Sequence, residues 1–202
     1  MSEYRNFVED FPGRCQRLLS RYFRSAESSD LEVTLLLAVA GSGLLIPYAR
    51  LTESEHPSQD KSRFELAKNS INSVLNSKFF GSPLNPESDP GSWKVGSLVD
   101  ITDSPDFWDW TKIKPISKDK TVNPLLKILR NALAHGNIFT MGSPSIESIV
   151  FLSKHDAKDP HAGYSCLVVA PADFKEFISR WLTLLAAAKI PGDVFSEELS
   201  LV

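Results

Sequence analysis

The stretch PLLKILRNALAHG, residues Pro124–Gly136, has the pattern of an amphipathic helix. On a helical wheel its leucine and isoleucine side chains gather on one side together with Ala132, as in a helix that packs against a core. Pro124 suits the first turn of a helix, and Gly136 is well placed to cap its end. The stretch therefore predicts a helix with one buried face and one polar face.

Apolar residues at helical spacing predict four further helices, over about 12–25, 31–47, 60–80 and from 171 onward. Pro47 is expected to end or kink the second of these helices. Two β-branched, apolar runs, 146–152 and 164–170, predict a pair of strands before the last helix. The predicted fold class is mostly α, with a small β-hairpin inserted before the last helix.

The chain of 202 residues is long enough for one domain, which we place at residues 1–190. Residues 81–122 form an irregular insertion rich in proline, glycine, serine and aspartate. Its aromatic side chains predict that it packs on the body of the domain with short helical turns. Residues 191–202 form a short, acidic tail that is expected to be loosely held.

The composition favours a soluble, cytoplasmic protein without a metal or cofactor. The net charge is −3, so any contact with nucleic acid must come from a local basic patch. Cys15 and Cys166 lie far apart in the sequence and match neither a metal-ligand cluster nor a disulfide framework. The N-terminus lacks the apolar region of a signal peptide. The uncharged run 33–49 is expected to be a buried helix, with no membrane contact.

The polar face of the helix at 124–136 carries the candidate catalytic residues Arg130, Asn131 and His135. Arg130 and His135 lie at the two edges of this face, and Asn131 is in line with His135. An arginine can hold two phosphate oxygens, and a histidine near a helix C-terminus can exchange protons near neutral pH. The alternative is that His135 is only a cation at a helix end and Arg130 only a solvated side chain.

The stretch 129–138 resembles the Arg-polar-x-x-x-His signature of the HEPN family. Two further stretches resemble a prokaryotic branch of that family: the run from Glu32 to Pro47, and the predicted hairpin followed by Asp173–Phe177. The resemblance implies a HEPN-like antiparallel helical bundle with the small β-hairpin inserted before its last helix. It also implies that the domain forms a homodimer and brings two copies of the motif together. Many such proteins are metal-independent endoribonucleases in toxin–antitoxin, phage-defence or CRISPR-associated systems. Others have lost catalysis and bind nucleotide, RNA or a protein partner.

The resemblance also implies roles for the three motif residues. Arg130 would stabilise charge on the scissile phosphate, and Asn131 would position the substrate or His135. His135 would act as acid or base while the 2′-hydroxyl of RNA attacks. The expected partners are RNA, a second copy of the chain and a cognate antitoxin or regulatory protein.

Three other groups of residues have both a functional and a structural interpretation. The first group is the arginine stripe, defined as Arg14, Arg17, Arg21 and Arg24. The stripe and Lys127 could bind the RNA backbone, or the stripe could be a solvated helix face. Trp108 and Trp110 could stack on bases, but packing of the insertion is favoured. The third group is His155, Asp156, Asp159 and His161. These side chains are of the types that bind metal ions, but exposure to solvent is the favoured interpretation.

Overall fold

The computed structural model describes residues 7–52, 61–87, 91–99, 101, 105–155 and 163–188. The helices are α1 (Phe7–Glu27), α2 (Glu32–Thr52), α3 (Lys61–Asn76), α4 (Val122–His135) and α5 (Pro171–Ala188). The strands are β1 (Lys94–Leu98), β2 (Lys114–Pro115), β3 (Ile138–Met141), β4 (Ser148–Lys154) and β5 (Tyr164–Val169). Two short 3-10 turns, η1 (Pro105–Phe107) and η2 (Trp110–Lys112), precede β2. All five helices expected from the sequence are confirmed.

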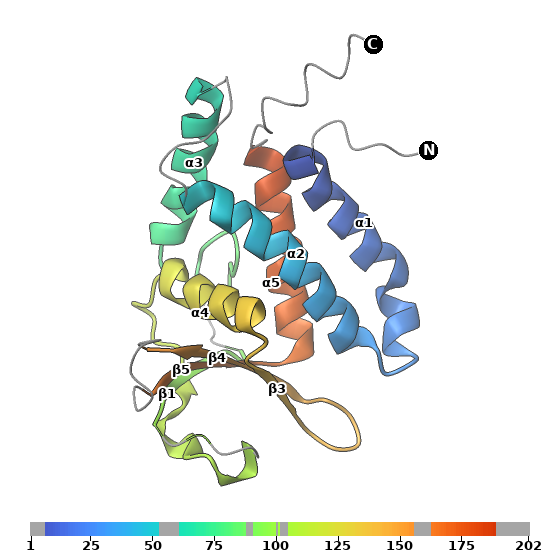
Figure 1. The fold of residues 1–202 in the computed structure, drawn as a ribbon, viewed down its shortest axis with the longest axis vertical. Coiled ribbons are helices and arrows are strands. Elements are labelled where there is room, and N and C mark those ends of the chain that lie inside the picture. Colours follow the sequence, from blue (N-terminus) through green and yellow to red (C-terminus); the bar gives the residue numbers. More distant parts are fainter. Residues whose placement is uncertain are drawn as a thin grey trace.

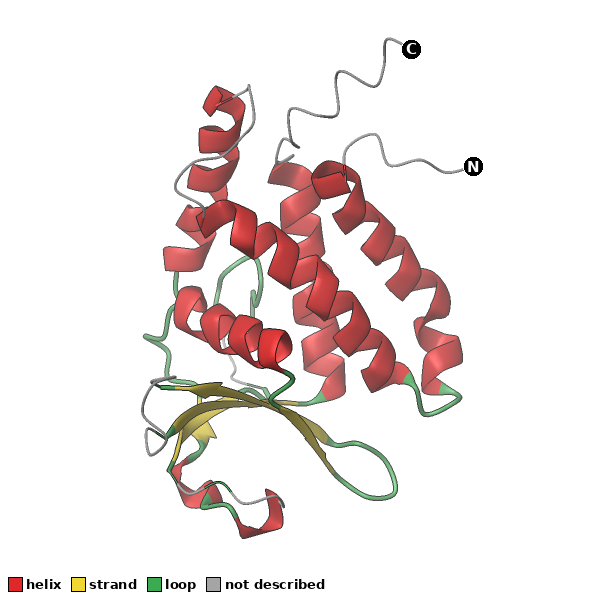
Figure 2. Ribbon diagram, in the orientation of Figure 1, coloured by secondary structure: helices red, strands yellow, loops and turns green. Residues whose placement is uncertain are grey.

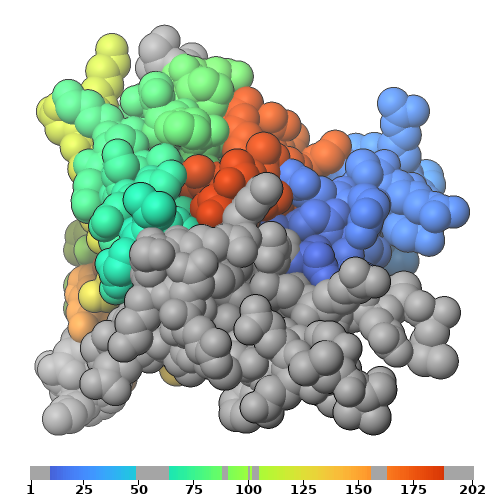
Figure 3. All heavy atoms as spheres, turned by 90° about the horizontal axis from the view of Figure 1, so that it is seen from above, coloured from blue at the N-terminus to red at the C-terminus, as the bar shows by residue number. Residues whose placement is uncertain are grey.

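The helices lie on one side of the sheet, with α4 directly above it (Figures 1 and 2). Viewed from above, α5 lies between α1 and α3, and it packs against both (Figure 3). The main core fills the space between helices and sheet and contains the fully buried side chains of Phe79, Phe151, Phe174 and Trp181. Burial of each such side chain contributes about 1.5–3 kcal/mol, so this core holds α4 and α5 against the sheet.

The sheet is larger than the small hairpin that the sequence predicts. It has five strands in the order β2-β1-β5-β4-β3, and each neighbouring pair is antiparallel. The predicted pair is β4 and β5, to which β3 is added directly after α4. The 81–122 insertion is not irregular throughout, because it supplies β1 and β2. β1 covers the second edge of β5, whose backbone N–H and C=O groups would otherwise lack partners.

The insertion covers the sheet face that points away from the helices. Trp108 is 4% exposed there and meets the Phe139 ring edge to face, with 4.9 Å between ring centroids. Trp110 donates its indole N–H to the carbonyl of Pro105 at 2.9 Å. The packing interpretation of these two tryptophans is therefore confirmed. A buried Trp108 cannot stack on a base.

Pro47 is expected to end or kink α2, and the expectation of an end is wrong, since the helix continues to Thr52. Proline lacks the N–H that would bond the carbonyl four residues earlier, which here belongs to Gly43. Trp181 of α5 donates its indole N–H to that carbonyl at 3.0 Å. The carbonyl therefore has a partner and is not left as an unsatisfied buried acceptor. Among the described helices, α2 included, none is long and apolar enough to cross a membrane.

Candidate active site

The motif residues occupy the last turns of α4, and the end of that helix is fixed to the sheet. Gly136 adopts the left-handed conformation, with φ 68°, and its N–H caps the carbonyl of Ala132. The next residue, Asn137, also donates its N–H to Ala132, at 3.0 Å, and its carbonyl accepts the N–H of Leu152 in β4 at 3.0 Å. The predicted glycine cap is confirmed, and it turns the chain directly from α4 into β3.

Arg130 and Asn131 are joined by their side chains. The guanidinium of Arg130 donates from Nη1 to Oδ1 of Asn131 at 2.9 Å. On the helical wheel Arg130 and His135 lie about 140° apart, but Asn131 precedes His135 by four residues and shares its edge of the helix. The hydrogen bond therefore draws the positive charge of Arg130 across the polar face towards the edge that carries His135.

Asn131 is in turn bonded to the sheet, a contact that the sequence did not suggest. Its amide Nδ2 donates to Oγ of Ser153 in β4 at 3.0 Å, and Ser153 is only 7% exposed. Because arginine can only donate, Oδ1 of Asn131 must face Arg130 and its amide nitrogen must face Ser153. The only sequence signal for Ser153 is a serine in place of the apolar residue that the strand pattern would favour there.

His135 is exposed at the end of α4, as are Ala134 and Lys127 on the same polar face. Unlike the side chains of Arg130 and Asn131, the imidazole of His135 has no hydrogen bond or ion pair with any residue that the structure describes. The motif thus combines an arginine and an asparagine held by hydrogen bonds with a histidine whose ring is accessible. This arrangement can offer positive charge and proton exchange to a ligand on the surface.

A second polar contact lies on the same face of the sheet. Ser153 pairs with Ser165 across β4 and β5, and Nε2 of the exposed His155 lies 3.0 Å from Oγ of Ser165. The exposure expected for His155 is confirmed. His161, Asp156 and Asp159 lie outside the described residues. Within the described part of the chain, no group of three or more histidine, cysteine or acidic side chains is placed to hold a metal ion.

The arginine stripe lies on α1, which packs against α2 and α5, whereas α4 packs against α2 and the sheet (Figure 1). Arg17, Arg21 and Arg24 are exposed, and Arg14 is partly buried. The structure therefore places the stripe and the motif on separate helices and does not bring them together within one chain. Lys127, one turn before Arg130 and Asn131, lies beside the motif on the same helix.

The two cysteines belong to the core. Burial raises the pKa of the Cys15 thiol to about 11 and that of Cys166 to about 12. Both thiols therefore remain protonated near neutral pH and are poor nucleophiles.

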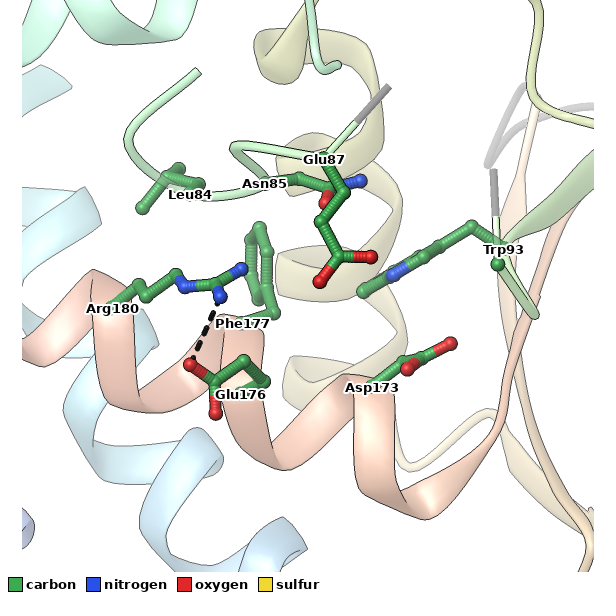
Figure 4. A pocket seen from close by; sticks show the side chains of 9 residues that line it. Leu84, Asn85, Glu87, Trp93, Asp173, Glu176, Phe177 and Arg180 are labelled. Atoms are coloured by element: carbon green, nitrogen blue, oxygen red, sulfur yellow. Dashed lines mark ion pairs between the residues drawn. The ribbon is translucent and has the colours of Figure 1, made fainter. Parts of the chain in front are cut away.

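A small pocket of about 50 Å³ lies between α5 and the segment that leads into β1 (Figure 4). Its charged lining consists of Glu87, Asp173, Glu176 and Arg180. Arg180 is paired with Glu176 at 3.0 Å, and Asp173 accepts two hydrogen bonds from Ser92. The carboxylates of Asp173 and Glu176 therefore already have structural partners, and no residue of the Arg130–His135 motif lines the pocket.

Comparison with known proteins identifies the family of the chain. The family model described as HEPN pEK499 p136 matches residues 1–191. No curated protein and no solved structure matches the chain. The family match spans all five helices and the whole sheet, and it includes the motif on α4. The chain therefore belongs to the HEPN family.

Proposed function

We propose that this protein is a metal-independent endoribonuclease that acts as a toxin or defence effector. The observation that carries the proposal is the hydrogen bond between Arg130 and Asn131, which directs a guanidinium towards the edge of α4 where His135 is exposed. A charge that can hold phosphate oxygens and a group that can move a proton are what cleavage of an RNA phosphodiester requires. Membership of the HEPN family supports a nuclease role in general.

The proposed reaction is internal transfer at phosphorus. The 2′-oxygen of RNA bonds to the neighbouring phosphorus while the bond from phosphorus to the 5′-oxygen breaks. A base takes the proton of the 2′-hydroxyl, and an acid gives a proton to the departing 5′-oxygen. The products are a 2′,3′-cyclic phosphate and a 5′-hydroxyl. Arg130 stabilises the charge on the phosphate oxygens, and Asn131 holds Arg130.

The reaction uses one base and one acid, while each copy of the motif has one histidine. We therefore propose that a homodimer supplies both, with His135 of one copy as base and His135 of a second copy as acid. The exposed Ala134 lies between the two edges of the polar face and leaves room for a second α4. A cognate antitoxin or regulatory protein would cover the same face.

The experiment that tests this function is incubation of the purified protein with matched RNA and DNA strands, with and without a chelator. A mechanism in which the 2′-hydroxyl attacks cannot act on deoxyribose, and it does not use a water molecule activated by a metal ion. We expect cleavage of the RNA alone, unchanged by chelator, with cyclic phosphate ends identified by mass spectrometry. Efficient cleavage of the DNA, or complete loss of activity with chelator, would contradict the proposed mechanism.

The net charge of −3 favours a second candidate function. A protein without an overall basic field binds RNA only through local patches. The alternative is a HEPN domain that has lost catalysis and binds nucleotide, RNA or a protein partner. Retention of RNA binding without any cleavage in the same assay would favour this alternative.

The arginine stripe provides a further prediction about RNA binding. Replacement of Arg17 and Arg21 together by alanine should weaken binding and reduce the slope of log K against log salt concentration by about 1 to 2, at about 0.7 per neutralised single-strand phosphate. The control is the double replacement of the exposed Lys114 and Lys118, which removes the same charge elsewhere. If both double variants keep the wild-type slope, the stripe is a solvated helix face.

A further inference from the structure

We infer that Ser153 is a positioning residue of the α4 motif: by holding Asn131, it sets the place of the Arg130 guanidinium. The inference rests on the proposed function for its effect on cleavage, but the anchoring itself can be measured without any activity. Ser153 lies in β4, 18 positions beyond the last motif residue, His135. No sequence motif includes it.

The burial of Ser153 is the first argument. Ile149 and Phe151 precede it at alternate positions of β4 and are fully buried in the core below the helices. The next position on that face holds a hydroxyl at 7% exposure, where an apolar side chain would pack without any polar penalty. A buried polar group is stable only with a hydrogen-bond partner, and here that partner is Asn131.

Comparison with another buried serine supports a specific role. Ser82, at 3% exposure, bonds the backbone of its own turn, where it donates to the carbonyl of Phe79. Such a serine is explained by local structure. Ser153 instead bonds a side chain 22 residues away that belongs to the motif. Its hydroxyl links the sheet to the polar face of α4.

The donors and acceptors of these two hydrogen bonds fix the orientation of the Asn131 side-chain amide. Nδ2 of Asn131 donates to Ser153, so Oδ1 is left to accept Nη1 of Arg130. Without the hydroxyl of Ser153, the amide of Asn131 can rotate and the long side chain of Arg130 regains its rotamer freedom. A guanidinium that is displaced by about 1 Å stabilises the transition state less well.

The first test is a double-mutant cycle with RNA cleavage as the readout. Ser153→Ala should lower kcat by about 3- to 10-fold, the range expected for loss of one neutral hydrogen bond. In the Asn131→Ala background, Ser153→Ala should have no further effect, because there is no amide left to hold. Ser165→Ala is the matched control: it removes a neighbouring hydroxyl on the same face, bonded to His155 instead, and should leave kcat unchanged.

A variant of similar volume separates positioning from folding. Ser153→Cys preserves the packing but offers only a weak acceptor, so it should lose kcat as Ser153→Ala does, with an unchanged circular dichroism spectrum. Ser153→Thr keeps a hydroxyl and should restore kcat. If RNA cleavage depends on His135, and both Ser153→Ala and Ser153→Cys keep the wild-type kcat, the inference is overturned. It would also be overturned if Ser153→Ala lowers kcat by the same factor in the wild-type and in the Asn131→Ala background.

The second test needs no activity and so separates this inference from the proposed function. In ¹⁵N-labelled protein, exchange of the Asn131 side-chain amide protons with water should be faster in Ser153→Ala than in wild type or Ser165→Ala. Faster exchange in a protein that cleaves no RNA would support the anchor and refute the nuclease. Unchanged exchange would refute the anchor, whatever the activity.

Discussion

Replacement of His135 by alanine is expected to lower RNA cleavage by about 10²–10⁴-fold, the usual contribution of a general acid or base. In a dimer with one His135 from each copy, the substitution removes both the proton acceptor and the proton donor. The effect should appear in kcat, since binding of the RNA depends on Arg130 and on other cations. Cleavage of a labelled RNA under single-turnover conditions would measure the loss directly.

The stability of the His135→Ala variant should be close to that of the wild type. The imidazole of His135 is exposed and has no hydrogen bond to the described residues, and surface substitutions of this kind usually change the free energy of unfolding by about 0.5 kcal/mol or less. A matched control is His155→Ala, which removes another exposed histidine, bonded to Ser165, and should cleave RNA like the wild type. Equal cleavage by the wild type and His135→Ala would remove His135 from the mechanism.

Replacement of Ala134 by tryptophan should abolish cleavage although Arg130 and His135 are untouched. Ala134 is exposed between the two edges of the polar face, and its small side chain is what lets a second α4 approach. A tryptophan there would hold the two copies apart and separate their motifs. It would not overpack the core, and the helix propensities of tryptophan and alanine differ by less than about 0.7 kcal/mol. We therefore expect a folded monomer with a near-native circular dichroism spectrum.

The assembly state and the activity of Ala134→Trp are measured together, by light scattering and by RNA cleavage. Ala187 is an exposed alanine near the end of α5, so Ala187→Trp makes the same chemical change on another helix. That control should remain an active dimer. If Ala134→Trp is also a fully active dimer, the motif face is not the contact surface, and a composite site of two copies is wrong.

Much of the fold can be predicted from the sequence because its signals are local. The apolar periodicity of α4 and the glycine that follows His135 predict both the helix and its end, and each depends only on residues within a few positions. The same holds for α1, α3 and α5 and for the pair β4 and β5. The polar face with Arg130, Asn131 and His135 also follows from helix geometry alone.

Strand β1 could not be predicted, since its short sequence KVGSL has a glycine at its centre and a weak strand pattern. It becomes a strand because β5 has an open edge that must be paired. In the same way, Pro47 predicts an end or a kink of α2 by a local rule. The helix nevertheless continues to Thr52, and Trp181, 134 residues after Pro47, supplies a donor to the carbonyl of Gly43 that the proline leaves without its helical partner.

The sequence by itself determined which motif residues share a helix face, because 100° per residue fixes their directions from the axis. Only the tertiary structure decided where the charge of Arg130 lies. The wheel separates Arg130 from His135, but the buried hydroxyl of Ser153 orients Asn131, and Asn131 draws the guanidinium across the face. That orientation depends on a strand packed beneath the helix, and no pattern within the helix contains it.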